Sequence, residues 1–242
     1  MALASVTTSC RAASYELTVY DDELPDPGEG ELETILSYAK PRPDDDMRTN
    51  HVAQAQVELG YGLSRQLAVG LEIPAAFAGR THKVKGASIE LQYVTPHDPL
   101  QGGYVGLRAG VGREASVYEA EVESAVELNP ILGYRWGRLH TTVNPTLEIP
   151  MHAEESRAQF RPSAKAAWQL VERSDVGVEY YGDWGPVNSL LPRARRNEAV
   201  YAVWEDRISH CRINAGVGRG LHPAIGSEDR WVAKVALEFE LD

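Results

Sequence analysis

The chain has 242 residues, of which 43% are hydrophobic, and its formal net charge at pH 7 is −11. This length suits one large all-β domain as well as two smaller domains. The acidic balance argues against a nucleic-acid partner, because phosphate binding needs an excess of Lys and Arg. No window approaches eighteen uninterrupted apolar residues, which excludes a transmembrane helix.

The first thirty residues are not expected to form strands. The stretch MALASVTTSCRAASYELTV has no basic start, and Thr7, Thr8 and Ser9 interrupt its apolar run. It is therefore a poor secretory signal, unless it is the remnant of one that begins upstream. The acidic segment DDELPDPGEGE is too rich in Pro and Gly for a strand interior. We expect residues 1–30 to be a leader or periplasmic segment outside the sheet.

Two cysteines, Cys10 and Cys211, lie far apart in the chain, and neither belongs to a CxxC pair. This spacing supports neither a disulfide framework nor a zinc or redox site. Cys211 is interpreted as a small apolar residue on a strand. The sequence indicates no role for Cys10.

From residue 31 onward, apolar and polar side chains alternate with a period of two, which is the pattern of β-strands. In residues 51–76, HVAQAQVELGYGLSRQLAVGLEIPAA, the alternation continues on both sides of the turn GLSRQ. Residues 198–205 are too uniformly apolar for their faces to be assigned. Twelve candidate strands lie near residues 32–38, 53–61, 67–74, 87–93, 105–112, 120–135, 139–149, 160–169, 176–184, 198–205, 211–217 and 231–241.

The connections between these strands come in two sizes. Tight turns with typical turn residues follow the second, sixth, eighth and tenth strands, at GLSRQ, RWGR, VERSD and WEDRIS. Longer polar segments follow the first, third, ninth and eleventh strands, at PRPDDDMRTN, GRTHKVKG, GPVNSLLPRARRN and GRGLHPAIGSEDR. Short turns on one rim and longer loops on the other are typical of outer-membrane barrels.

Soluble and membrane barrels both show this alternation with a period of two. A soluble barrel turns its polar face outward, whereas a membrane barrel turns its apolar face outward. Several runs exceed nine residues, the length that crosses a bilayer, whereas soluble strands are usually shorter. The polar face mixes Gly with Glu, Arg and Gln, as expected of a lumen. Aromatic residues also fall near strand ends, the depth at which they collect in bilayers: Tyr38, Tyr61, Tyr93, Tyr134, Trp136, Trp168, Trp184 and Trp231.

The sequence therefore predicts an all-β fold: a single antiparallel up-and-down transmembrane β-barrel of about twelve strands over residues 31–242. We expect this barrel to lie in a bacterial outer membrane, where its outer face contacts membrane lipid. A soluble lipocalin-like binding barrel remains the alternative.

Two stretches resemble bacterial outer-membrane barrels grouped with the phenol-degradation pathway: TVYDDELPDPGEGELETILSYAKP and VELGYGLSRQLAVGLEIP. In those barrels an acidic, Gly-containing segment precedes a first strand that ends in an aromatic–Ala pair, and a hairpin of the type YGLTDRLELGLELP follows. The matching residues are Asp21, Asp22, Gly28, Gly30, Tyr38, Ala39, Tyr61–Leu63 and Gly70–Pro74.

The resemblance implies an outer-membrane barrel whose solutes are hydrophobic or aromatic compounds. It also implies that the barrel-assembly machinery recognises the C-terminal strand. Such barrels usually end on an aromatic residue, whereas here Phe239 is followed by Glu240, Leu241 and Asp242.

If the charged face lines an enclosed interior, the acidic excess would disfavour anions in a narrow pore for small solutes. Opposite charges on facing strands could instead pair and close a small barrel, so a closed structural barrel with a salt-bridged lumen stays open as an alternative. The pore-lining candidates are Glu58, Glu72, Glu90, Arg108, Glu121, Glu123, Glu127, Arg135, Glu148, Arg161, Lys165, Glu179, Arg212 and Lys234.

A third alternative is an outer-membrane lipid hydrolase with a Ser, His and Asn set on the outer face. His140 and Asn144 are four residues apart but lie on the polar face, and no nucleophile is placed beside them. Glu121 and Glu123 are the best acid–base pair, yet alternate Glu residues on a strand need no catalysis to explain them. GxSxG, HExxH and phosphate-loop motifs are missing. We predict a channel or transport-related barrel for small molecules, with no enzyme activity, cofactor or metal.

Overall fold

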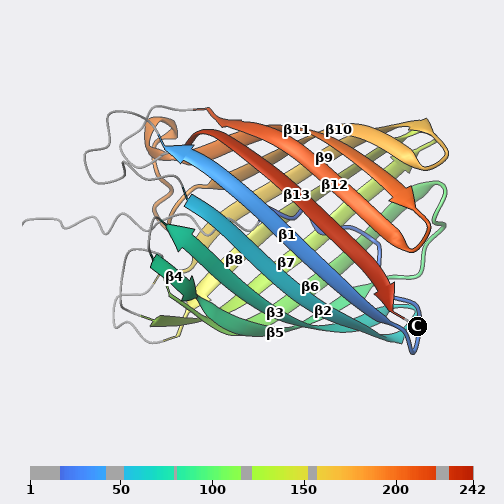
Figure 1. Ribbon diagram of the computed structural model, residues 1–242, viewed down its shortest axis with the longest axis horizontal. Coiled ribbons are helices and arrows are strands. Elements are labelled where there is room, and N and C mark those ends of the chain that lie inside the picture. Colours follow the sequence, from blue (N-terminus) through green and yellow to red (C-terminus); the bar gives the residue numbers. More distant parts are fainter. Residues whose placement is uncertain are drawn as a thin grey trace, which may run out of the picture.

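The computed structural model describes residues 17–41, 52–78, 81–115, 122–151, 157–221 and 229–241. Twelve strands form one closed antiparallel barrel, and the prediction of the fold is confirmed (Figure 1). The wall strands are β1 (Gly30–Pro41), β2 (Val52–Ser64), β3 (Leu67–Ala78), β5 (Gly86–Val94), β6 (Gly102–Ala115), β7 (Val122–Trp136), β8 (Leu139–Pro150), β9 (Gln159–Val171), β10 (Ser174–Asp183), β11 (Asn197–Ile208), β12 (Cys211–Gly220) and β13 (Asp229–Leu241). Among the described residues, no helix has the length and apolarity needed to cross a membrane.

The ring closes where the first strand pairs with the last. Strand β1 pairs with β2 through Gly30↔Tyr61 and with β13 through Gly30↔Leu241, so both of its edges are occupied. Each of the other wall strands pairs with its neighbours in chain order. Closure leaves no free edge in the wall, which is the condition for a sheet to span hydrocarbon.

The two faces of the wall are as the alternation predicts. Leu71, Val105 and Val143 are 37%, 50% and 46% exposed on the outer face, whereas Arg108 is only 3% exposed inside. The wall strands contain between nine and fifteen residues. Their lengths and this apolar outer face match the hydrocarbon layer of a bilayer.

The two rims differ in their connections. At the rim that carries the C-terminus, two residues each join β2 to β3, β7 to β8, β9 to β10 and β11 to β12. We call this the turn rim and the opposite one the loop rim. Aromatic side chains form an exposed girdle on the outer face near both rims, with Tyr61, Tyr93 and Trp168 at the turn rim and Tyr38 and Trp231 at the loop rim. Such girdles mark the two membrane–water interfaces.

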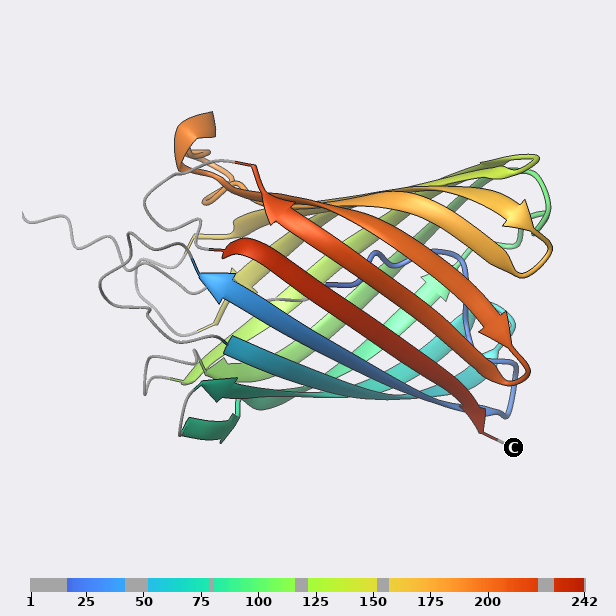
Figure 2. The ribbon, with the colours of Figure 1, turned by 45° about the horizontal axis from the view of Figure 1, so that its top comes forward.

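Three features depart from the sequence pattern. The predicted loop GRTHKVKG contains a short strand, β4 (Thr81–Val84), which pairs with the loop-rim end of β3. In β11, Tyr201 and Val203 are buried inside the barrel, although the lumen was expected to be polar. Residues 17–29, expected to be part of a leader or periplasmic segment outside the sheet, instead enter the lumen from the turn rim (Figure 2). We call residues 17–29 the lumen segment.

Candidate functional site: the barrel lumen

The lumen segment is attached to the wall at the turn rim. The amide of Gly28 donates to the carbonyl oxygen of Gly62 at 2.8 Å, and the amide of Gly62 donates to the carbonyl oxygen of Glu29 at 3.0 Å. A Cβ at Gly62 would overlap the carbonyl oxygen of Asp26, so only glycine permits this approach.

Farther into the barrel, wall side chains bind the backbone of the lumen segment. Lys234 Nζ donates to the carbonyl oxygen of Leu17 at 2.9 Å, and Asn144 Nδ2 donates to that of Tyr20 at 2.9 Å. The guanidinium of Arg108 lies 3.7 Å from the centre of the Tyr20 ring. Backbone polar groups that would otherwise be buried without partners are thereby satisfied.

Two adjacent carboxylates of the segment bind opposite sides of the wall. Asp22 accepts a hydrogen bond from Arg135 Nη2 at 2.7 Å, and His97 Nε2 lies 2.8 Å from its other oxygen. Asp21 lies 3.6 Å from Lys165 Nζ and 4.0 Å from an Arg212 nitrogen. Burial alone would raise the pKa of Asp21, but these two cations hold that pKa well below its usual range. Asp21 is therefore a fixed anion in the middle of the lumen.

Arg108 is surrounded by three carboxylates of β2, β3 and β5. Its Nη2 lies 3.1 Å from Glu58 and 3.9 Å from Glu72, and it also forms an ion pair with Glu90. Ligand atoms of these three glutamates lie within 4.8 Å of one another, as in sites for a divalent cation. In this structure the Arg108 guanidinium supplies one positive charge to the three carboxylates.

A second network crosses the opposite side of the lumen. Lys165 Nζ lies 2.6 Å from Glu205, and Lys234 forms an ion pair with Glu179. Asn214 Nδ2 donates to both carboxylates, at 2.7 Å to Glu205 and 3.1 Å to Glu179. Because every charge here has a partner, the network ties β9 through β13 together across the interior.

The remaining candidates divide between the two ends of the lumen. Arg212 pairs with Glu23 of the lumen segment and lies 3.4 Å from Glu238, whereas Arg161 pairs with Glu148 nearer the loop rim. Glu127 lines a cavity there. Glu121 lies outside the described residues, and of Glu123 only the backbone, in β7, is described. Whether these residues line a conducting pore stays a prediction.

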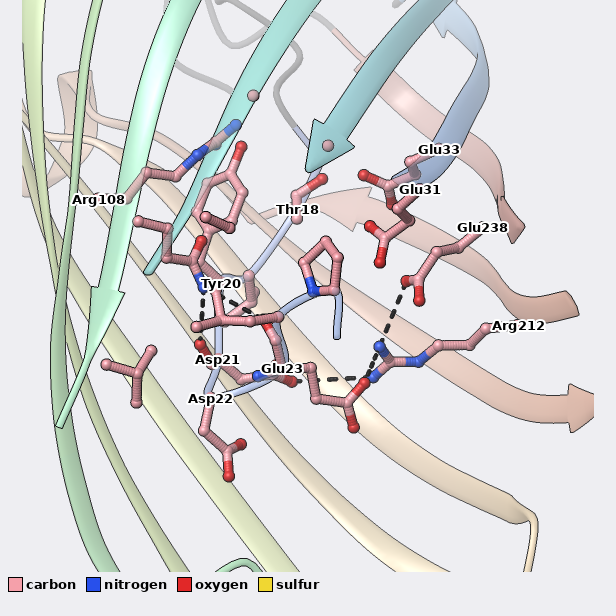
Figure 3. A pocket seen from close by; sticks show the side chains of 18 of the residues that line it. Thr18, Tyr20, Asp21, Asp22, Glu23, Glu31, Glu33, Arg108, Arg212 and Glu238 are labelled. Carbon is pink, nitrogen blue, oxygen red and sulfur yellow. Dashed lines mark hydrogen bonds and ion pairs between the residues drawn. The ribbon is translucent and has the colours of Figure 1, made fainter. Parts of the chain in front are cut away.

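In the part of the lumen that the structure describes, two cavities lie against the segment. The cavity toward the turn rim has a volume of about 850 Å³, and Glu31, Glu33, Glu238 and Arg212 point into it (Figure 3). The cavity toward the loop rim has a volume of about 100 Å³. Leu17 and Thr18 line both cavities, so the segment borders each of them.

The larger cavity is strongly acidic. Thirteen of its lining residues are Asp or Glu and seven are Lys or Arg, so acidic side chains outnumber basic ones. Glu31 and Glu33 have no salt-bridge partner among the described residues. The sequence pattern places Glu33 and Glu238 on the polar face, so both could have been predicted as lining residues. The carboxylates of the lumen segment could not, because no periodicity placed that segment inside.

The residues considered for a hydrolase serve the lumen network. His140 Nε2 lies 2.6 Å from the hydroxyl of Tyr104, which in turn lies 2.7 Å from the hydroxyl of Thr142. Asn144 is fully buried and binds the segment backbone, while Ser163 Oγ lies 3.3 Å from its amide oxygen. His140 and Asn144 both point inward, away from the face that lipid would reach.

A closed wall, an apolar outer face and a charged interior define the chain as a transmembrane β-barrel of the outer-membrane type. Solved structures of that class have the same fold. An outer membrane channel from Pseudomonas putida F1 superposes with a TM-score of 0.68 at 9% sequence identity, covering 93% of this chain and 100% of that one. The KdgM porin superposes with a TM-score of 0.55 at 8% identity, covering 88% and 99% of the two chains.

No protein-family model and no curated protein sequence matches the chain. The resemblance to the phenol-degradation barrels therefore stays a prediction, whereas the barrel fold is established.

Proposed function

We propose that this protein is an outer-membrane transport barrel that passes small molecules. The observation that carries the proposal is the acidic cavity of about 850 Å³ inside a wall that faces lipid. A structural barrel needs no such water-accessible space. The fold shared with an outer membrane channel and a porin supports the same function.

The charge of the cavity supports a preference for cations over anions. Rings of acidic side chains raise the local concentration of cations in a pore and exclude anions. Glu31 and Glu33 line this cavity and form no salt bridge with another described residue, so they are the residues to substitute in a test.

Reversal potentials in planar bilayers under a KCl gradient test this proposal. We expect the wild-type current to be cation-selective, and the variant Glu31→Gln/Glu33→Gln to lose much of that preference. Glu172→Gln, in the exposed β9–β10 turn, is the matched control and should leave selectivity unchanged. A correctly folded protein without any current would count against a pore.

A closed structural barrel is the second candidate, and the lumen segment favours it. The segment occupies part of the lumen, and Asp21 and Asp22 hold it there by ion pairs. The two candidates differ in whether the segment can leave its position. A conducting pore requires the segment to be displaced, whereas a closed structural barrel keeps it in place.

The solute class is a separate proposal. The smaller cavity is lined partly by Leu17, Tyr201 and Val232, whose side chains form an apolar cluster on the inner face. An apolar patch followed by an acidic cavity suits a small neutral or cationic solute with an apolar part. The resemblance implies hydrophobic or aromatic solutes, which agrees with the apolar part. Uptake of labelled aromatic amines and aromatic acids into proteoliposomes tests it, with the amines expected to enter faster.

A further inference from the structure

The connection between β10 and β11 lies at the loop rim of the barrel. We call residues 184–196 the rim loop; it contains the short helix η1 (Arg193–Arg195), drawn as an orange coil projecting from the wall in Figure 2. The amide of Leu191 donates to the carbonyl oxygen of Trp184 at 2.8 Å, and Arg196 Nε donates to that of Leu191 at 2.9 Å. These bonds give the rim loop a defined shape.

The rim loop is cationic in an acidic protein. It contains Arg193, Arg195 and Arg196 and no Asp or Glu, although the whole chain carries a net charge of −11. Arg193 and Arg195 are exposed, and neither has a carboxylate partner among the described residues. Glu198, the nearest acidic residue after the loop, is buried and accepts a hydrogen bond from the Tyr180 hydroxyl at 2.7 Å. The surface of the loop therefore presents positive charge alone.

Two arginines are held against tryptophans on the same outer face. The guanidinium of Arg196 lies 4.3 Å from the Trp184 ring centre, and that of Arg219, on β12, lies 5.6 Å from the Trp231 ring centre. Tryptophans at the end of a membrane strand mark the depth of the lipid headgroups. Stacking therefore fixes two guanidinium groups at that depth.

We propose that the rim loop and Arg219 form a binding surface for the phosphate groups of outer-leaflet lipid. Guanidinium groups bind phosphate oxygens in a bidentate manner, and the exposed side chains of Val187 and Leu190 contact the adjoining acyl chains. Long loops lie on the extracellular side of such barrels, where the outer leaflet carries a phosphorylated glycolipid. This surface acts independently of solute passage through the lumen.

Arginines at the turn rim lack this arrangement. Arg138 and Arg173 are exposed, but each stands alone in a two-residue turn, and Arg173 follows Glu172. They therefore provide a control of equal charge on the opposite rim.

Native mass spectrometry of the detergent-purified protein tests the proposal, with diphosphorylated lipid A, the same lipid with both phosphates removed, and phosphatidylcholine as probes. We expect the wild type to bind the diphosphorylated lipid in preference to the other two. Because each arginine near an anionic lipid surface contributes about 1 kcal/mol, Arg193→Gln/Arg195→Gln should weaken that binding about thirtyfold. Arg138→Gln/Arg173→Gln should bind as the wild type does.

The substituted arginines are exposed, so the variants should keep the heat-modifiable gel mobility of a folded barrel. Arg219→Gln, a single change on a different strand, should weaken binding about fivefold. Unchanged binding by Arg193→Gln/Arg195→Gln, an equal loss in the turn-rim control, or equal binding of the lipid without phosphates would overturn the proposal. Displacement of the lipid by an equal concentration of inorganic phosphate would also overturn it, since the site would then recognise a free anion.

Discussion

The position of the lumen segment can be tested at Asp22. Its side chain is 4% exposed and lies 2.7 Å from Arg135 Nη2. Asp22→Asn keeps the shape of the side chain but removes its charge, so the ion pair is lost. We expect this variant to release the segment from its position more often than the wild type does.

The size of the effect follows from the exposure of the pair. Breaking a fully buried ion pair costs about 3–5 kcal/mol. The Arg135 side chain is 22% exposed and can be partly hydrated after the change, so we expect a value at the lower end, about 3 kcal/mol. A difference of this size shifts the equilibrium between the bound and displaced segment by roughly a hundredfold.

Single-channel recording in planar bilayers measures this shift as the fraction of time spent at a high conductance level. Asp26→Asn, which changes an exposed carboxylate of the same segment, is the control and should behave as the wild type does. If Asp22→Asn folds correctly and spends no more time at high conductance than the wild type, the ion pair between Asp22 and Arg135 does not hold the segment in its position. An equal rise in Asp26→Asn would show a non-specific loss of negative charge instead.

Two further predictions concern stability, measured by urea unfolding of the barrel in lipid vesicles with tryptophan fluorescence. Gly62→Ala should lower the free energy of unfolding by about 1–3 kcal/mol, because its Cβ overlaps the Asp26 carbonyl oxygen, whereas Gly60→Ala, whose Cβ would lie 3.4 Å from Pro25 Cγ, should be tolerated. Equal effects at both glycines would contradict this account of the segment's attachment. Leu71→Arg should lower the same free energy by about 2–4 kcal/mol, because it places a charge in hydrocarbon, whereas Leu100→Arg in the exposed β5–β6 connection should have little effect. A harmless Leu71→Arg would mean that the outer face does not contact lipid.

The strands of the wall could be predicted from the sequence because the alternation of apolar and polar residues that defines them lies within each strand. Neighbouring residues such as Leu71 and Glu72 must point to opposite faces of a strand, and the apolar member faces lipid in a membrane barrel. The period-two pattern therefore predicted both the twelve strands and the inward direction of Arg108 and Lys165, which the structure confirms.

Pairing inside the lumen could not be predicted in this way. Asp22 and Arg135 are 113 residues apart, and their contact depends on barrel diameter and on what occupies the interior. In β11, Tyr201 and Val203 face inward because Leu17 packs against them, so this strand is apolar on both faces. A local pattern contains no information about a segment that arrives from elsewhere in the chain.

Pairing of β1 with β13 has a consequence for biogenesis. The ring cannot be sealed until β13 has joined β1, through contacts such as Gly30↔Leu241. The lumen segment directly precedes β1 in the chain. It must therefore either lie among the strands before β1 pairs with β13, or enter the closed barrel afterwards through one of its two openings. Closure of the barrel around a segment that is already in place is the simpler route. The wall and the contacts of the lumen segment would then form in the same step.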